Sequence, residues 1–147
     1  MDGTPRLREQ ACFALYTASR AVIGLYRPML DRLGITYPQY LVLMALWEQD
    51  GLTVTALGDA LQLDSGTVSP LLKRLEAAGF VERRRESEDE RRVTVHLTGA
   101  GAALEREGCE IAKTVGSSTD MPHDELFALR DKLNEFTASL HDHRAAE

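Results

Sequence analysis

Two cysteines, Cys12 and Cys109, carry the thiols of this 147-residue chain, and a thiol can act as a nucleophile toward oxidants. Cys12 lies in the first turns of a predicted helix, where the helix dipole favours the reactive thiolate. Arg8 also favours ionisation of this thiol, whereas Glu9 opposes it. The residues themselves therefore allow two interpretations of Cys12: a reactive thiolate, or a small apolar side chain buried in a core.

Cys109 and the four histidines give weaker indications. Cys109 falls on the face of a predicted C-terminal helix, where it is either unreactive or able to form a disulfide with an oxidised partner. His96 falls on the outward face of a predicted strand, and the spacing of His141 and His143 suits no helical metal pair. We therefore expect neither a metal site nor a cofactor.

The stretch from Thr53 to Leu97 has the pattern of a helix-turn-helix followed by a hairpin. Its central helix starts after Asp64, stops at Gly79, and has one apolar face with the spacing i, i+3, i+4, i+7. That face consists of Val68, Leu71, Leu72 and Leu75. A shorter helix around Leu57 to Leu61 precedes it after only three residues, so the two helices must cross.

The opposite face of the central helix is small, polar and basic, as expected of a helix that contacts bases and phosphates in a major groove. Its residues are Ser65, Thr67, Ser69, Lys73 and Arg74. Two predicted strands follow, at 80–85 and 91–97, and the charged tip between them ends in two arginines. Such a wing suits a phosphate backbone or a narrow minor groove, although a solvated hairpin with no ligand would have the same pattern.

Charge and hydropathy limit the function classes. The net charge is −6, but seven basic and seven acidic residues cancel between Asp64 and Thr98, so the acidic excess lies outside the predicted DNA-binding head. We therefore expect non-specific DNA binding to be weak and sensitive to salt. The longest apolar run, Tyr40 to Trp47, is too short to cross a membrane, so we expect a cytoplasmic protein with reduced thiols.

Long helices with heptad-like apolar stripes flank the head. The first is predicted at about 7–34 and carries two adjacent apolar stripes. Together they make a face wider than a single neighbouring helix would cover. A buried helix that starts near Thr36 follows it, and then the head at about 52–98. The other long helices are predicted at about 98–144. We expect one domain over 1–147, mainly α with a small β-wing. The long helices would form a dimerisation bundle or, alternatively, pack within one chain.

Six strings of residues resemble those of the MarR family of dimeric winged-helix regulators, and within it the repressors that sense organic hydroperoxides. The similarity covers about 12–101 and fades in the last two helices. The strings are Cys12–Tyr16, Tyr26–Pro28, Thr36–Tyr40, Leu63–Thr67, Pro70–Leu75 and Asp89–Arg91. The resemblance implies that a hydroperoxide oxidises Cys12 and that the protein then releases DNA. It also implies that Tyr26 and Tyr37 hydrogen-bond the sulfur, and that Arg91, supported by Asp89, enters the minor groove.

Helix geometry adds a constraint to this interpretation. Cys12 and Tyr26 are fourteen residues apart on one predicted helix, or about 21 Å at the α-helical rise. They can meet only across a two-fold axis with antiparallel first helices, so the thiol site requires a homodimer. By resemblance, Cys109 is a candidate to form the disulfide with oxidised Cys12. Otherwise a small cellular thiol would do so.

The sequence therefore predicts a homodimeric repressor, not an enzyme, that binds a pseudo-palindromic double-stranded operator with two recognition helices about 34 Å apart. Two alternatives remain open. One is a MarR-type regulator released by a small aromatic ligand, with Cys12 only packing. The other is a thiol-dependent peroxidase, which the winged head does not favour.

Overall fold

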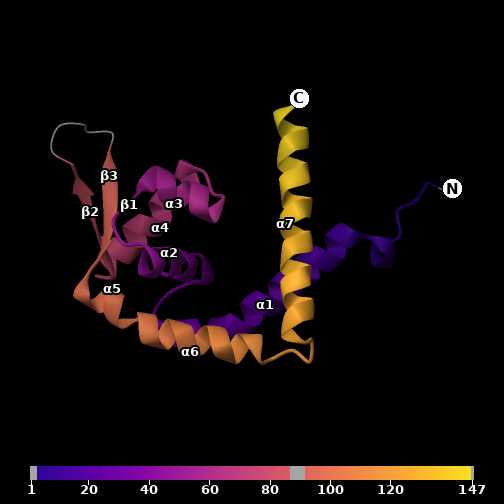
Figure 1. Cartoon of the computed structure of the whole chain (residues 1–147), viewed down its shortest axis with the longest axis horizontal. Helices are drawn as coiled ribbons and strands as arrows, with labels where there is room; N and C mark the ends of the chain where they lie inside the picture. The colour runs from indigo at the N-terminus through magenta and orange to yellow at the C-terminus, as the bar shows by residue number, and fades with distance from the viewer. Residues whose placement is uncertain (1–2, 87–91, 147) are drawn as a thin grey trace. The chain divides into compact units, whose positions relative to one another are not determined.

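The computed structural model describes residues 3–86 and 92–146 and forms two compact units, which divide between Val115 and Gly116 (Figure 1). The first unit contains a 3-10 turn, Leu7–Glu9, and the helices and strands up to α6. These are α1 (Ala11–Leu33), α2 (Tyr37–Glu48), β1 (Leu52–Thr53), α3 (Val54–Leu61), α4 (Ser65–Ala77), β2 (Val81–Arg85), β3 (Val93–Leu97), α5 (Gly99–Ala103) and α6 (Glu105–Gly116). The second unit is α7 (His123–Ala145).

The helix-turn-helix is formed by α3 and α4, and both helices are capped by side chains. Thr53 accepts a hydrogen bond from the backbone N–H of Ala56, and Asp64 accepts one from that of Thr67. Gln62 closes α3 in the left-handed conformation, with φ of 55°. These local signals end α3 and begin α4 within a few residues, which confirms the predicted helix-turn-helix.

The wing is an antiparallel sheet with strand order β1-β3-β2. Strands β2 and β3 pair from Val81–Leu97 to Arg85–Val93, close to the bounds predicted from the sequence. The short strand β1 pairs Leu52 with Val95 and was not predicted. Residues 87–91, the tip of the wing, lie outside the described residues, and with them the predicted DNA contacts Asp89 and Arg91.

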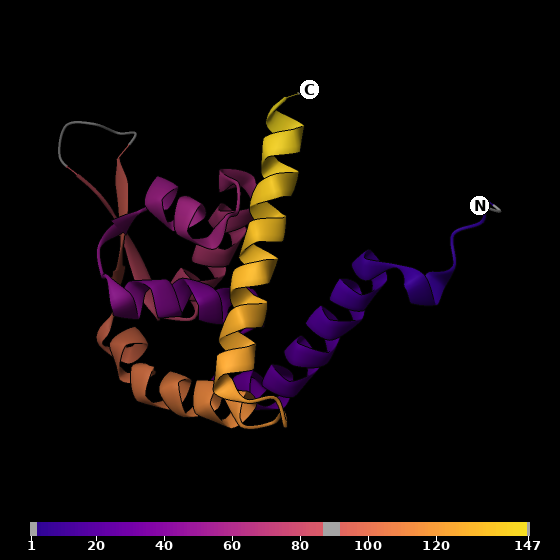
Figure 2. The same cartoon turned by 45° about the vertical axis from the view of Figure 1, so that its right-hand side comes forward.

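Helix α2 is the centre of the core. Thr36 and Gln39 form a capping box at its start, and Tyr40, Val42, Leu43 and Leu46 are at most 1% exposed. In both views it lies between the α3–α4 pair and the α5–α6 segment (Figures 1 and 2). The predicted burial of this helix is confirmed, apart from Met44, which is exposed. The mainly helical fold with a small β-wing is confirmed as well.

The sequence predicts helices over about 98–144 and gives no sign of a break soon after the wing, where the structure differs. The structure has two helices, α5 and α6, with a break at Leu104. Helix α5 consists of glycine and alanine alone and contacts β3, and its Gly101 carbonyl accepts a hydrogen bond from the Trp47 indole. A contact with α2, 54 residues away in sequence, therefore fixes α5, and helical periodicity carries no sign of it.

Large apolar side chains remain exposed on two long helices. On α1 they are Phe13, Tyr16, Val22 and Leu25. On α7 they are Phe127, Leu129, Leu133, Phe136 and Leu140. Apolar stripes of this length favour a role in association. None of the helices described is both long enough and apolar enough to cross a membrane.

Candidate DNA interface and thiol site

The candidate recognition surface is the exposed face of α4. The five side chains of α4 that were predicted to contact DNA are all exposed there, opposite the face buried in the core. They are Ser65, Thr67, Ser69, Lys73 and Arg74. The Thr67 hydroxyl also donates to the Asp64 carboxylate at 3.0 Å, so the N-cap of the helix fixes the orientation of one candidate contact. The arrangement gives one helix face with neutral donors near its start and cations further along.

The base of the wing adds three consecutive exposed arginines, Arg83, Arg84 and Arg85 on β2. Arg83 is tied to α4: its backbone N–H donates to Glu76 at 2.9 Å, and its guanidinium donates to the same carboxylate at 3.3 Å. Arg84 pairs with Glu82 on its own strand. Glu76 therefore joins the recognition helix to the wing.

The hydrogen bonds from Arg83 to the Glu76 carboxylate are expected to stabilise the fold. The backbone N–H of Arg83, and then its guanidinium, lower the pKa of Glu76 below its ordinary value of 4.5. A lowered folded-state pKa stabilises the fold above pH 4.5, and this stabilisation disappears as the pH falls through the folded value. Because the pair is 38% exposed, we expect Glu76→Gln to lower the free energy of unfolding by less than about 1 kcal/mol at pH 7.

Urea denaturation of the wild type and Glu76→Gln at pH 7 and at several values below 4.5 measures this difference, which should shrink with the pH. Glu82→Gln is the matched control, since the described contacts of Glu82 are to the Arg84 side chain, with no backbone N–H donor. An equal difference at every pH would show that ionisation of Glu76 does not matter.

The candidate thiol site is divided between the two ends of α1. Cys12 is the second residue of the helix and is exposed, so within one chain it is not the buried apolar side chain that the sequence allowed. Tyr26 lies near the other end, where its ring centroid is 4.8 Å from that of Tyr37. Because α1 is continuous from Ala11 to Leu33, about 21 Å of helix separates Cys12 from Tyr26. The structure thus brings the two tyrosines together and leaves the thiol away from them.

Both phenols are suited to donate hydrogen bonds. Burial raises the pKa of Tyr26 above 10.0, and the neighbouring Tyr37 raises it further. Burial also raises the pKa of Tyr37. Both hydroxyls therefore keep their protons at neutral pH, and a thiolate placed between them would accept two hydrogen bonds.

A third tyrosine, Tyr40, belongs to the same cluster and was not singled out from the sequence. Its ring centroid lies 5.6 Å from that of Tyr26 and 6.3 Å from that of Tyr37. Its hydroxyl donates to the backbone carbonyl of Gly108 at 2.9 Å. Burial, and then the neighbouring Tyr26, Cys109 and Tyr37, raise the pKa of Tyr40 to about 12. The i, i+3 spacing of Tyr37 and Tyr40 was the signal that could have placed them on one helix face.

Cys109 lies on α6 directly after Gly108 and is exposed. The structure therefore places it beside the tyrosine cluster and at the surface. Among the residues described, no three of His, Cys, Asp and Glu come together as metal ligands would.

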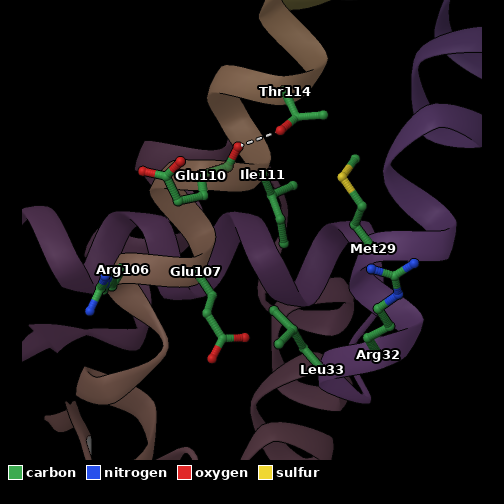
Figure 3. Close-up of a pocket in the computed structure, with 8 residues that line it drawn as sticks. All are labelled: Met29, Arg32, Leu33, Arg106, Glu107, Glu110, Ile111 and Thr114. Atoms are coloured by element: carbon green, nitrogen blue, oxygen red, sulfur yellow. Dashed lines mark hydrogen bonds between the residues drawn. The ribbon is translucent and has the colours of Figure 1, made fainter.

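A cleft of about 440 Å³ lies between the end of α1 and α6 (Figure 3). Met29, Leu33 and Ile111 supply its apolar side chains. Two arginines, two glutamates and a threonine complete the lining: Arg32, Arg106, Glu107, Glu110 and Thr114. This mixture could hold a small, partly apolar ligand with a charged group.

Proteins of known family share this architecture. The sequence profile of the MarR family matches residues 35–93. The chain is 43% identical to the organic hydroperoxide resistance transcriptional regulator of Bacillus subtilis strain 168, over 92% of both chains. It is 47% identical to the HTH-type transcriptional regulator TtmR of Methylorubrum extorquens strain PA1, over 95% of this chain and 72% of that one.

Among solved structures, AbfR of Staphylococcus epidermidis superposes in three states. Reduced AbfR bound to DNA gives a TM-score of 0.78 at 37% identity, over 92% of this chain and 94% of that one. Overoxidised AbfR bound to DNA gives 0.78 at 36%, with the same coverage. Disulfide-formed AbfR gives 0.68 at 36%, over 90% and 93%. With this fold and these relatives, the chain belongs to the MarR family of winged-helix transcriptional regulators.

Proposed function

We propose that this regulator is a homodimeric repressor that releases its operator when an organic hydroperoxide oxidises Cys12. The observation that carries the proposal is the division of the thiol site. Tyr26 and Tyr37 form a pair of protonated phenols whose ring centroids are 4.8 Å apart, while an exposed thiol lies about 21 Å from Tyr26 along the same helix. Antiparallel packing of two α1 helices brings Cys12 of each subunit to the tyrosine pair of the other. The name of the Bacillus relative supports the same signal.

The exposed apolar side chains of α1 support this dimer. Val22 and Leu25, on one side of α1, are 41% and 47% exposed in the single chain. Packing against a second α1 would bury them, and each large apolar side chain that becomes buried stabilises association by about 1.5–3 kcal/mol before the costs of ordering. The long helices of the chain thereby hold two winged heads at a fixed separation.

The chemical step consumes one hydroperoxide per thiolate. The Cys12 sulfur attacks the terminal peroxide oxygen, an S–O bond forms, the O–O bond breaks, and the alkoxide leaves as an alcohol after taking a proton. The sulfenic acid then condenses with a second thiol to give a disulfide and water. Cys109 and a low-molecular-weight cellular thiol are the two candidates for that second thiol.

The output is a change in DNA affinity. In the reduced dimer the two α4 helices would enter successive major grooves about 34 Å apart on a pseudo-palindromic operator. Lys73 and Arg74 would contact phosphates, and the shorter side chains at the start of α4 would contact base edges. Arg91, supported by Asp89 in the wing tip, would enter the minor groove. A hundredfold loss of affinity on oxidation requires about 2.7 kcal/mol of coupling free energy.

The test is operator binding, measured by fluorescence anisotropy with and without cumene hydroperoxide. We expect wild type to lose about a hundredfold in affinity, and Cys12→Ser to bind the operator with unchanged affinity in both conditions. If a small thiol reacts with oxidised Cys12, Cys109→Ser should release DNA like wild type. If Cys109 is the second thiol, Cys109→Ser should lose only the inter-subunit disulfide. Release of DNA by peroxide-treated Cys12→Ser would exclude the proposal.

The cleft between α1 and α6 favours a second candidate, release by a small aromatic acid. Its apolar side chains and two arginines, Arg32 and Arg106, would suit such a ligand. Benzoate is a suitable probe in the same assay. Release of Cys12→Ser from the operator by benzoate, with no effect of peroxide, would establish this function instead. Peroxide consumption over many turnovers with an added thiol reductant would point to the third possibility, a peroxidase.

A further inference from the structure

Helix α2 connects the tyrosine pair to the base of the wing. Its first residue, Tyr37, lies against Tyr26 of α1. At its other end are Trp47 and, just beyond it, Asp50, whose carboxylate accepts a hydrogen bond from the backbone N–H of Leu97 at 2.8 Å. The twelve residues of α2 span about 18 Å. The buried helix α2 and the turn that follows it thus contact both the candidate sensor and the last residue of β3.

Two aromatic side chains of α2 hold the segment after the wing. The Tyr40 hydroxyl donates to the carbonyl of Gly108 in α6, and the Trp47 indole N–H donates to the carbonyl of Gly101 in α5, both at 2.9 Å. The two rings also contact each other, with centroids 6.0 Å apart. A Cβ at position 108 would lie 2.5 Å from the Trp47 ring, so α6 can approach α2 only because that residue is glycine.

The contacts continue from α5 to the start of the wing. Gly101 packs against the backbone carbonyl of Phe80, the residue before β2, with no room for a side chain between them. The same carbonyl accepts a hydrogen bond from the backbone N–H of Thr98, and the Thr98 hydroxyl donates to the carbonyl of Gly79 at 2.6 Å. A shift of α5 must therefore shift the base of the wing.

We propose that Tyr40 and Trp47 are positioning residues that transmit the state of the Tyr26–Tyr37 pair to the wing. Tyr40 packs against both members of the pair, so a change in their position on oxidation of the thiol displaces the Tyr40 ring. Its hydrogen bond moves α6, and the Trp47 hydrogen bond moves α5 and the base of the wing. The inference rests on the proposed function and adds the path by which oxidation weakens DNA binding.

Tyr40→Phe and Trp47→Phe test the relay, because each removes one hydrogen-bond donor and keeps an aromatic ring. We expect both variants to bind the operator when reduced with affinities within about threefold of wild type. On treatment with cumene hydroperoxide their affinity should fall by about tenfold or less, against about a hundredfold for wild type. Full release by both variants would overturn the relay.

Trp47 also supplies a direct optical readout, because it is the sole tryptophan of the chain. Its fluorescence should change on peroxide treatment of the wild type, should not change in Cys12→Ser, and should change less in Tyr40→Phe. A variant that only loses stability would not alter this pattern. Ile35→Val, a core substitution between α1 and α2, is the stability control and should keep wild-type release and emission change.

Labelling of the sulfenic acid with a dimedone probe separates the failure of the relay from the failure of the proposed function. If Cys12 of the wild type is not labelled and DNA is not released, the proposed function fails and the relay with it. If Cys12 is labelled and wild type releases DNA, a constant Trp47 emission contradicts the relay alone. Labelling of Tyr40→Phe at the wild-type rate, together with weakened release, is the expected result, and labelling lost in that variant would place Tyr40 in the thiol site instead.

Discussion

Replacing Gly101 with alanine is expected to lower the free energy of unfolding by about 3 kcal/mol, at the upper end of the cost of overpacking. A Cβ at this position would lie well inside 3.0 Å of the Phe80 carbonyl oxygen, and real Cβ atoms essentially never approach that closely. The obstacle is backbone, so no rotamer change can relieve it. Either α5 or the start of β2 must move, and the hydrogen bond from Trp47 would be strained by the same movement.

Gly99→Ala provides the matched control, since it lies in the same short helix and nothing stands within 4 Å of its added Cβ. It should be neutral or should stabilise the fold by up to about 1 kcal/mol, because alanine loses less conformational entropy than glycine in a helix. Urea denaturation of the two variants at pH 7 measures the contrast. Equal midpoints would mean that α5 is not held tightly against the wing.

Replacing Leu25 with glutamate is expected to separate the proposed dimer. Leu25 is 47% exposed in the single chain and lies three residues after Val22, on the same side of α1. Antiparallel packing of two copies would bury an introduced carboxylate in the interface, twice per dimer, with no partner to offset its desolvation. We expect the dimer dissociation constant to rise by at least about a hundredfold, equivalent to about 2.7 kcal/mol.

Analytical ultracentrifugation gives the dissociation constant, and operator binding should fall with it, since one winged head alone has little electrostatic attraction for DNA. Leu25→Met keeps an apolar side chain of similar volume and should remain dimeric. If Leu25→Glu stays dimeric and still binds the operator, the α1 face is not the dimer interface, and the proposed arrangement of Cys12 with the tyrosine pair fails.

Local signals in the sequence were sufficient for the winged head. The cap at Asp64 and the four apolar residues on one face of α4 are each satisfied within a few residues of chain, so tertiary contacts had little to override. Along β3 the strand itself was predicted, but its burial does not alternate, because Thr94 is buried beside Val95. Helix α2 could be predicted as buried because it is apolar on all sides. Together with the six strings, these signals were enough to identify the family.

Features that depend on contacts between distant residues could not be predicted. Strand β1 has two residues, too few to show alternation. Helix α5, which precedes the break at Leu104, accepts a hydrogen bond from the Trp47 indole at Gly101. The position of Tyr40 depends on its hydrogen bond to Gly108, 68 residues away. The thiol site shows a different limit: residue spacing excludes contact between Cys12 and Tyr26 within a chain, and the proposed site is complete only in the proposed dimer.

The burial of α2 also determines how a signal can travel along it. Its central residues Val42, Leu43 and Leu46 are 0% exposed, so their amide hydrogens should exchange with solvent only when the whole unit unfolds. Slow deuterium uptake there, unchanged by oxidation, is therefore expected even while the wing moves. If α2 stays intact during release, it passes on a disturbance by tilting or sliding as a whole. In that case DNA release should follow oxidation of the thiol without a local unfolding step between them, and the rate of oxidation would set the rate of release.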